Sequence, residues 1–520
     1  MISDKQEDFI IASGRQFIAA ADSALNLVTI RTPPKSSARA ADMYYAYRFL
    51  VFANCGAVLV LAGCSSVPLD TAVPLPLLAA YVLVGENGAA SARAILPVSK
   101  SKTADSVCPV ITVDGKSQPM TLRVAAATVS QRPTASDVEH SKPSQFPITT
   151  CEFALPRNAS SAKIGGTKLK LPNAEPRRIV LIGDTGCRMK KADQAWQACL
   201  DQSEWPFRLI ADAAAAMSPD LVLHVGDYHY RENACPPDVP GCQTSPWGYG
   251  WDTWQADLFD PAAKLLAAAP WVVVRGNHEE CRRAGQGWFR FLDPRPFDEA
   301  RSCNDAANDN IANFTAPYPV PLANDLQLII FDSAVSGSRP LDPAKPRDAH
   351  AFKQYHEQFQ AVDLLADKPG VTSIFLNHHP ILGYSAYDNR VQGGSAALLS
   401  VMKTLRPLVY YPASVQLALH GHVHLFEAIS FSSNHPATIL SGMGGDELST
   451  VLPDPFPLDI PPSDGVKLDS ITHSNQFGFV VMDKQASTWK IGAYDVHGAL
   501  QTTCILAGSK LRCDKTGLLK

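Results

Sequence analysis

The chain has 520 residues, with 46 lysines and arginines against 50 aspartates and glutamates, and its formal net charge is −4. Hydrophobic residues make up 46% of the chain and charged residues 18%, which is typical of a globular protein and excludes a disordered or fibrous one. Because basic residues are not in excess, the chain lacks the broad positive field of a nucleic-acid-binding protein, and we expect no nucleic acid partner. At about 150 residues per domain, the length predicts two to four domains.

The N-terminal region contains an apolar segment with the features of an export signal. Residues 49–62 form an apolar run that directly follows Arg48. A membrane-spanning helix needs about 20 apolar residues, so the run has the length of a signal peptide instead. It ends in the sequence LAGC, whose cysteine is Cys64. This ending resembles a bacterial lipoprotein signal, in which the cysteine is lipidated and becomes the mature N-terminus.

We therefore expect residues 1–63 to be a targeting segment and the mature protein to lie in the periplasm, anchored to a membrane only through a lipid on Cys64. Met43 stands just before the apolar run and is an alternative start. Two other interpretations stay open: a short buried helix, or a cytoplasmic tail (residues 1–42) on an uncleaved anchor.

The other cysteines support export. The chain has twelve cysteines, and ten remain when Cys55 and Cys64 of the signal region are set aside. Pairing of sequence neighbours is the simplest of the many connectivities that ten cysteines allow, and disulfides persist in oxidising compartments. A zinc site is the competing interpretation, but no Cys-x-x-Cys spacing occurs. The neighbouring pairs are Cys108 and Cys151, Cys187 and Cys199, Cys235 and Cys242, Cys281 and Cys303, and Cys504 and Cys513.

Two sequence patterns divide the rest of the chain. Residues 64–175 show short β-like runs punctuated by Gly, Pro, Ser and Asp, which predicts a small β-domain. In residues 176–520, short apolar strands alternate with amphipathic helical stretches, which predicts an α/β domain with largely parallel strands. The expected strands include residues 177–183, 221–226, 271–276, 326–332, 372–378, 415–421 and 437–442, and the expected helices are residues 207–217, 262–269, 350–368 and 395–405.

Five of these strands end in polar residues of the types that bind metal ions. The carboxyl ends of parallel strands meet at one edge of a sheet, so we expect these side chains to lie together. Oxygen and imidazole donors without a thiolate suit Zn, Mn and Fe. Each motif alone is more often a turn or a surface pair, but all five occur in order. They are Asp184-Thr185-Gly186, Asp227-Tyr228-His229-Tyr230, Asn277-His278-Glu279, Asn377-His378-His379-Pro380 and His422-Val423-His424.

The five motifs resemble those of the calcineurin-like metallophosphoesterase family and follow the family's order. Two departures from the common family pattern narrow the resemblance. The first motif has Gly186 where the family commonly has a histidine, and the second has Tyr230 three residues after Asp227. Both features resemble the purple acid phosphatase branch. The resemblance implies a two-sheet α/β/β/α sandwich, preceded by a small all-β domain.

The resemblance also implies two metal ions, Fe(III) and a divalent ion (Zn, Mn or Fe). A ferric ion would deprotonate the phenol of Tyr230 by its own charge. His378 is chosen over His379 because the family places its ligand two residues before the proline. The implied ligands of the first ion are Asp184, Asp227, Tyr230 and His424, and those of the second are Asp227, Asn277, His378 and His422. Asp227 bridges the two ions, and His278 would lie beside the substrate phosphate as a hydrogen-bond donor or general acid.

Several neighbouring residues have no clear role in the sequence. His229 and Arg188 could contact phosphate, but a solvated loop explains them better. Arg282 and Arg283 could bind an anion, yet a charged surface is an equal explanation. Residues 442–446 could form the rim of the site or merely a glycine-rich turn.

The function that this resemblance implies is an exported phosphoesterase. It would hydrolyse small phosphate monoesters, with a hydroxide shared by two metal ions about 3.5–4 Å apart as the nucleophile. The alternative is a phosphodiesterase acting on cyclic nucleotides or phospholipid head groups, since pocket shape decides between the two. A non-catalytic surface lipoprotein that retains the fold is a third interpretation, but every expected ligand position holds a residue that can bind metal.

Overall fold

The computed structural model describes residues 76–98, 107–387 and 390–519. All of them belong to one compact unit, Leu75–Lys520. The expected targeting segment, with Met43 and Cys64, lies outside the described residues. Among the described helices, none has the length and apolar character needed to cross a membrane.

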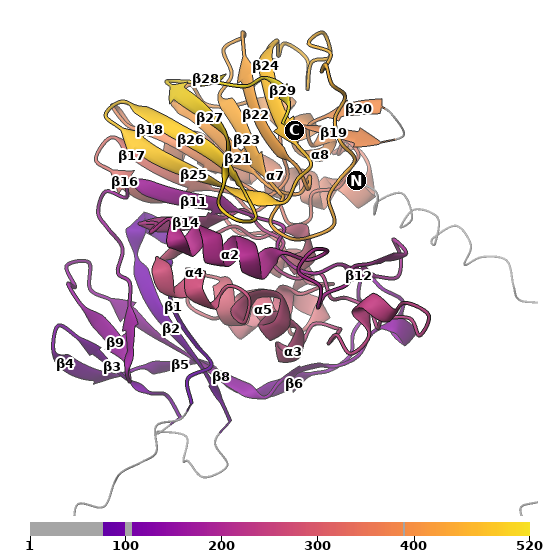
Figure 1. Ribbon diagram of the computed structural model, residues 1–520. Coiled ribbons are helices and arrows are strands. Elements are labelled where there is room, and N and C mark those ends of the chain that lie inside the picture. Colours follow the sequence, from indigo (N-terminus) through magenta and orange to yellow (C-terminus); the bar gives the residue numbers. More distant parts are fainter. Residues whose placement is uncertain (1–75, 99–106, 388–389, 520) are drawn as a thin grey trace, which may run out of the picture. The chain divides into compact units, whose positions relative to one another are not determined.

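Two large β-sheets form the centre of the described part of the chain (Figure 1). In order across the first sheet, its eleven described strands are β28 (Lys510–Cys513), β27 (Leu500–Ala507), β26 (Thr488–Asp495), β25 (Gly478–Gln485), β11 (Arg178–Ile182), β14 (Leu221–His224), β15 (Trp271–Val273), β1 (Ala79–Val84), β2 (Ala90–Pro97), β8 (Ile148–Leu155) and β5 (Thr121–Val124). The eight described strands of the second are β16 (Tyr318–Ala323), β17 (Leu326–Ile330), β18 (Thr372–Leu376), β21 (Val415–His420), β23 (Ala437–Ser441), β22 (Phe426–Phe431), β24 (Leu468–Ser474) and β29 (Gly517–Leu518).

The two sheets pack against each other through apolar side chains. Leu181, Leu223 and Val272 of the first sheet share one buried cluster with Ile374 and Leu417 of the second. Strands β11, β14 and β15 run parallel, as do β17, β18, β21 and β23. Such strands are covered on both faces, which explains their nearly continuous apolar sequences.

Helices cover the outer faces of the sheets and bury one side each. In α7 (Pro346–Ala366), Tyr355, Phe359 and Val362 are buried at helical spacing against the second sheet. Helix α8 (Ala396–Leu405) lies in the same cluster and begins at Ser395, whose side chain caps it. Helices α2 (Phe207–Ala216) and α4 (Ala263–Ala268) cover the first sheet. The α/β/β/α sandwich expected from the sequence is therefore confirmed.

Short elements connect these layers. The remaining α-helices in the described part of the chain are α3 (Trp251–Trp254), α5 (Gly285–Gly287) and α6 (Asp309–Ala312). Three two-stranded sheets also lie among the described residues: β12 (Met189–Lys190) with β13 (Ala195–Trp196), β19 (Tyr384–Tyr387) with β20 (Arg390–Gly393), and β6 (Ala127–Val129) with β7 (Ser144–Phe146).

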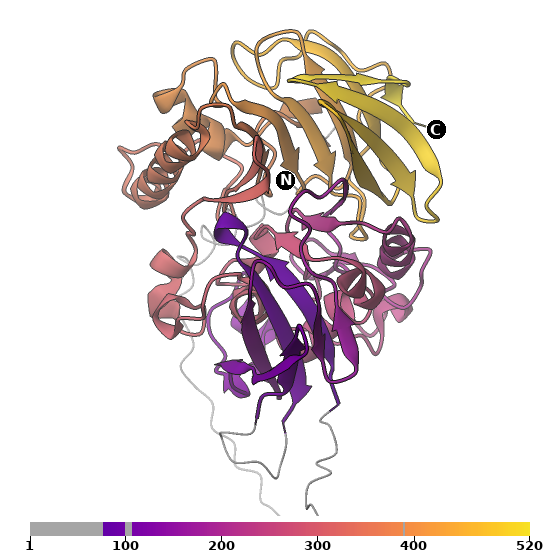
Figure 2. The same cartoon turned by 90° about the vertical axis from the view of Figure 1, so that its left-hand side faces the viewer.

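The N-terminal β-strands continue the first sheet across residue 175. Strand β1 pairs in parallel with β15, and β2, β8 and β5 extend the sheet from there. In Figure 2 these indigo strands lie at the opposite end of the sheet from the yellow C-terminal strands. Residue 175, the expected boundary of a small β-domain, is therefore not a break in the main sheet. A smaller separate sheet contains β10 (Thr167–Leu169), β9 (Ala162–Ile164), β3 (Val110–Val113) and β4 (Lys116–Pro119).

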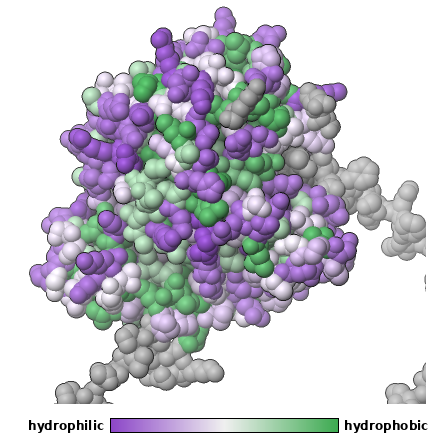
Figure 3. Space-filling model, viewed as in Figure 1, coloured by the Kyte–Doolittle hydropathy of each residue, from purple (hydrophilic) through white to green (hydrophobic). Residues whose placement is uncertain are grey.

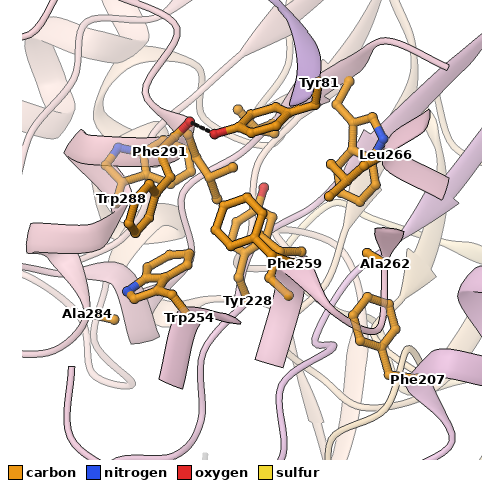
Figure 4. Close-up of a cluster of buried hydrophobic side chains, with 14 of the residues drawn as sticks. Tyr81, Phe207, Tyr228, Trp254, Phe259, Ala262, Leu266, Ala284, Trp288 and Phe291 are labelled. Carbon is orange, nitrogen blue, oxygen red and sulfur yellow. Dashed lines mark hydrogen bonds between the residues drawn. The ribbon is translucent and has the colours of Figure 1, made fainter. Parts of the chain in front are cut away.

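Aromatic packing explains why β1 joins the larger unit. Tyr81 of β1 is buried beside Phe259, with ring centroids 5.7 Å apart, and its hydroxyl donates to Phe291 O at 2.9 Å (Figure 4). Trp254 and Trp288 belong to the same cluster. These contacts join residues distant in sequence, so the local pattern of β-like runs does not reveal them.

Disulfides and surface composition complete the description. Five disulfides join the cysteine pairs that are neighbours in the sequence, Cys108–Cys151, Cys187–Cys199, Cys235–Cys242, Cys281–Cys303 and Cys504–Cys513.

On the face shown in Figure 3, hydrophobic residues are interspersed with hydrophilic ones. Exposed hydrophobic residues of this scattered kind are ordinary for a folded protein.

Candidate metal centre

The five sequence motifs follow the carboxyl ends of β11, β14, β15, β18 and β21. Three of these strands are neighbours in the first sheet and two are neighbours in the second. Side chains from both sheets can therefore meet at one edge of the sandwich, as ligand sites do in α/β folds.

The backbone turns sharply where the strands end. Asp184, Asp227 and His422 have left-handed backbone angles, with φ of 56°, 57° and 69°. Non-glycine residues adopt this conformation at a cost of about 1–3 kcal/mol, and such strain concentrates at functional sites. A glycine precedes each of them. A Cβ atom on Gly421 would lie 2.4 Å from Asp184 Oδ2, so glycine is required there for close approach.

The phenol of Tyr230 marks the first group of ligand candidates. Its Oη atom lies 2.9 Å from Asp227 Oδ2, 3.1 Å from Asp184 Oδ1 and 3.1 Å from His424 Nε2. All four residues are buried. The structure thus brings together the four residues predicted to bind the first metal ion.

A second group shares Asp227 with the first. His378 Nε2 lies 3.0 Å from Asp227 Oδ2 and 2.9 Å from Asn277 Oδ1. His422 Nδ1 lies 3.0 Å from the same Asn277 oxygen. Ligand atoms of Asp227, His378 and His422 all lie within 4.8 Å of one another. This is the relation that a bridging carboxylate requires.

The chemistry of the two groups fits metal ions. Asp184 and Asp227 are buried carboxylates on either side of the Tyr230 hydroxyl, which has one proton for three contacts. Burial raises the pKa of Asp184, because charge is unfavourable away from water. Two cations among these oxygen and nitrogen donors would neutralise the carboxylates.

Backbone carbonyl groups orient two of the histidines. His378 Nδ1 lies 2.9 Å from Val225 O, and His424 Nδ1 lies 2.6 Å from Glu447 O. Each carbonyl accepts a hydrogen bond from Nδ1, which leaves Nε2 free as a ligand atom. His379 instead places Nδ1 3.1 Å from Ser333 Oγ, and it does not join the donor groups.

Glu279 supports the loop of the second motif, a role that the sequence did not reveal. Its carboxylate accepts backbone hydrogen bonds from Asp227 at 3.0 Å and from Tyr228 at 2.8 Å. The amides of His229 and Gly276 also donate to it, at 3.2 and 3.1 Å. One buried side chain therefore fixes the loops of two motifs. The only signal in the sequence was its place directly after Asn277-His278.

His278 lies beside the ligand groups and not within them. Its ring centroid is 3.8 Å from that of Tyr230, and its backbone amide donates to Asp227 Oδ1 at 2.8 Å. Its Nδ1 atom is 3.0 Å from Glu232 Oε1. Glu232, which the sequence did not single out, accepts a hydrogen bond from the Tyr249 hydroxyl at 3.0 Å. The ring of His278 is thus held by a buried carboxylate.

Arg188 is part of the site and not of a solvated loop, so that expectation was wrong. Its guanidinium lies 5.0 Å from the centre of the Tyr230 ring and forms ion pairs with Asp446 and Asp193. Asp446 is fully buried and lies 3.3 Å from His424 Nδ1, and burial raises its pKa to about 6. His229 is buried as well. Of the two explanations for residues 442–446, the structure supports the one that places them at the site.

A two-sheet sandwich with carboxylate, amide, phenol and imidazole groups gathered at its strand ends is typical of metal-dependent hydrolases. Residues 177–426 match the family model described as calcineurin-like phosphoesterase. This part of the chain is therefore similar to the calcineurin-like phosphoesterases, and that similarity implies a dinuclear metal centre.

Three solved structures are similar to this chain at low sequence identity. Purple acid phosphatase PPD1 from seeds of yellow lupin (Lupinus luteus) is 15% identical with a TM-score of 0.50, over 84% of this chain and 75% of that chain. PhoD is 11% identical with a TM-score of 0.49, over 85% and 92%. A dimetal phosphatase from Danio rerio is 12% identical with a TM-score of 0.34, over 64% and 100%. No curated protein sequence matches the chain significantly.

Proposed function

We propose that the protein is a dinuclear metal-dependent phosphatase that hydrolyses small phosphate monoesters. The observation that carries the proposal is the position of Asp227 Oδ2, which lies 2.9 Å from Tyr230 Oη and 3.0 Å from His378 Nε2. One carboxylate oxygen thus joins two sets of donors, as a phosphoryl-transfer site with two metal ions requires.

Fe(III) is assigned to the donor group around Tyr230, and a divalent ion (Zn, Mn or Fe) to the group around Asn277. A phenolate is a hard oxygen donor suited to a ferric ion, and it replaces the histidine that the first motif lacks. When bound, the two ions supply an activated water molecule and stabilise negative charge on the phosphoryl oxygens. The first group is Asp184, Asp227, Tyr230 and His424, and the second is Asp227, Asn277, His378 and His422.

The remaining chemistry belongs to side chains beside the ligands. His278 is placed to donate a proton or a hydrogen bond to the leaving oxygen of the ester. Glu232 lies 3.0 Å from its Nδ1 atom and orients the ring. A positioned acid contributes about 10²–10⁴-fold to such reactions.

The test is hydrolysis of 4-nitrophenyl phosphate and of bis(4-nitrophenyl) phosphate by the purified protein. We expect turnover of the monoester to exceed that of the diester, and a chelator to abolish both. Asp227→Asn should remove nearly all activity, whereas Asp469→Asn, a matched change at an exposed position, should not. A diester preferred over the monoester would favour the phosphodiesterase alternative, and a protein inactive on both with its metals bound would contradict the proposal.

We also propose that the protein is exported to the periplasm and anchored through a lipid on Cys64. The LAGC sequence supports this, and so do the five disulfides, since disulfides persist in oxidising compartments. Intact-mass analysis of membrane-extracted protein should give a chain that starts at a lipidated Cys64 and has no free thiols. A cytosolic chain that retains residues 1–63 with reduced cysteines would contradict export.

A further inference from the structure

Two consecutive arginines follow the third motif, and the structure places them in opposite environments. Arg282 is exposed and donates to Thr134 O at 3.2 Å. Arg283 is 6% exposed and lies against His278. The two residues are of one type and adjacent, so only the packing of the loop separates them.

The Arg283 guanidinium lies between the imidazole of His278 and the backbone of a predicted metal ligand. Its Nη2 atom is 2.8 Å from Nδ1 and 2.7 Å from Nε2 of His278. Its Nη1 atom approaches Asn277 O at 3.5 Å. A phosphoryl group positioned between His278 and the metal ligands would therefore be next to this cation.

Glu232 holds the guanidinium in place. It is buried and forms an ion pair with Arg283 through Oε1. The carboxylate thereby anchors Nη2, while the Tyr249 hydroxyl donates to its other oxygen.

The guanidinium also has N–H donors that Glu232 does not engage. Among the described residues, the buried Nε atom of Arg283 has no hydrogen-bond partner. Within the part of the chain that the structure describes, its Nη1 atom has only the long contact with Asn277 O. A buried N–H group without an acceptor is unfavourable, and an oxyanion bound at the site would supply one.

We propose that Arg283 binds a non-bridging oxygen of the substrate phosphoryl group and makes the enzyme prefer monoesters to diesters. This inference rests on the proposed phosphatase function. A monoester dianion has three non-bridging oxygens that share two negative charges, whereas a diester has two that share one. A guanidinium forms charge-assisted, paired hydrogen bonds with such oxygens, and it gains more from the dianion.

The experiment compares kcat/KM for 4-nitrophenyl phosphate and bis(4-nitrophenyl) phosphate in the full-length protein and its variants. Arg283→Gln is expected to lower kcat/KM for the monoester about 10²-fold, as loss of a donor to the reacting group does. The loss on the diester should be much smaller, so the monoester-to-diester ratio falls. Arg283→Lys keeps the charge without the paired donors, and its ratio should be intermediate. Arg282→Gln is the matched control and should leave the ratio unchanged.

A second variant separates substrate binding from folding. Arg283→Gln leaves the Glu232 carboxylate without its arginine partner, so metal content and thermal unfolding are measured for every variant. The double variant Glu232→Gln/Arg283→Gln removes that buried charge as well and should show the same fall in the ratio. If Arg283→Gln loses its metals, the monoester-to-diester ratio of Arg283→Lys is used for the test instead.

The outcomes distinguish this inference from the proposed function. Equal losses on both esters in metal-loaded variants would overturn the role of Arg283 and leave the phosphatase function standing. A metal-loaded wild-type protein with no activity on either ester would overturn the proposed function itself, and the inference with it.

Discussion

Tyr230 Oη lies 2.9 Å from the Oδ2 atom of Asp227, the residue three positions before it in the chain. The same hydroxyl lies 3.1 Å from Asp184 and from His424, which follow strands of two different sheets. One phenol therefore joins three motifs. This geometry supports a metal-bound phenolate better than a tyrosine that merely packs.

The first prediction concerns the colour of the protein. Phenolate-to-iron charge transfer would make it purple, as in the branch that the motifs resemble. Tyr230→Phe keeps the ring and removes only the donor oxygen, so it should bleach the visible band and weaken iron binding. Absorption spectroscopy with iron analysis measures both.

Tyr228→Phe is the matched control for that change. The Tyr228 hydroxyl is buried but contacts the carbonyl groups of Val274 at 3.1 Å and His224 at 3.3 Å, away from the donor groups. Its removal should leave the band intact. A colourless wild-type protein that is fully active with Zn or Mn alone would refute the ferric assignment while the phosphoesterase assignment survives.

His278 is predicted to act on the leaving group and not on the metals. His278→Ala should retain both ions and lose about 10²–10⁴-fold in rate on an ester with a poor leaving group. The loss should be smaller with 4-nitrophenol as the leaving group, because that phenol departs with less help from a proton. A near-normal rate of His278→Ala on an alkyl phosphate would rule out this role.

Glu279 is predicted to position the bridging carboxylate. Each Glu279 oxygen accepts from two backbone N–H groups, so Glu279→Gln places an amide NH₂ group against two of the four donors, and each donor left without an acceptor costs about 1–3 kcal/mol. Because the Asp227 loop would shift, metal affinity should fall about 10–100-fold. Titration calorimetry measures the affinity, with Glu280→Gln as the control. Unchanged affinity in Glu279→Gln would contradict the positioning role.

Glu427 is predicted to make stability depend on pH. It is fully buried, and burial raises its pKa well above the ordinary value, so it stays protonated to a higher pH in the native state than in the unfolded chain. The unfolded chain ionises it above about pH 4.3, so this residue destabilises the fold as pH rises beyond that point. Relative to wild type, Glu427→Gln should therefore gain thermal stability between pH 5 and pH 8. A difference in midpoint temperature that does not change over this range would contradict the assignment.

The strands, and the candidate ligands that lie at their ends, could be predicted from the sequence because both depend on local pattern. Apolar runs such as residues 177–183 and 221–226 end at glycines, and Asp184 and Asp227 follow directly. Gly186, at the position where the family commonly has a histidine, and Tyr230 can each be recognised directly from the sequence. These features need no knowledge of packing.

What the sequence could not predict depends on contacts between distant segments. The pairing of β1 with β15, which carries the main sheet across residue 175, joins distant parts of the chain. Arg282 and Arg283 are identical in type, and only the packing of the loop, which brings Arg283 to the buried Glu232, separates their environments. Arg188 and Asp446 pair across the site for the same reason. In each case the environment of the residue depends on burial, which is a property of the folded chain.

The central claim is that two metal ions, joined by Asp227, are required for hydrolysis of phosphate monoesters. The most direct measurement is metal stoichiometry by mass spectrometry, taken with turnover of 4-nitrophenyl phosphate, for wild type and Asp227→Asn. Two ions per active wild-type chain, one of them iron, and loss of both metal and turnover in Asp227→Asn are the predicted result. An active wild-type chain without bound metal, or an Asp227→Asn variant with two ions and normal turnover, would contradict the claim.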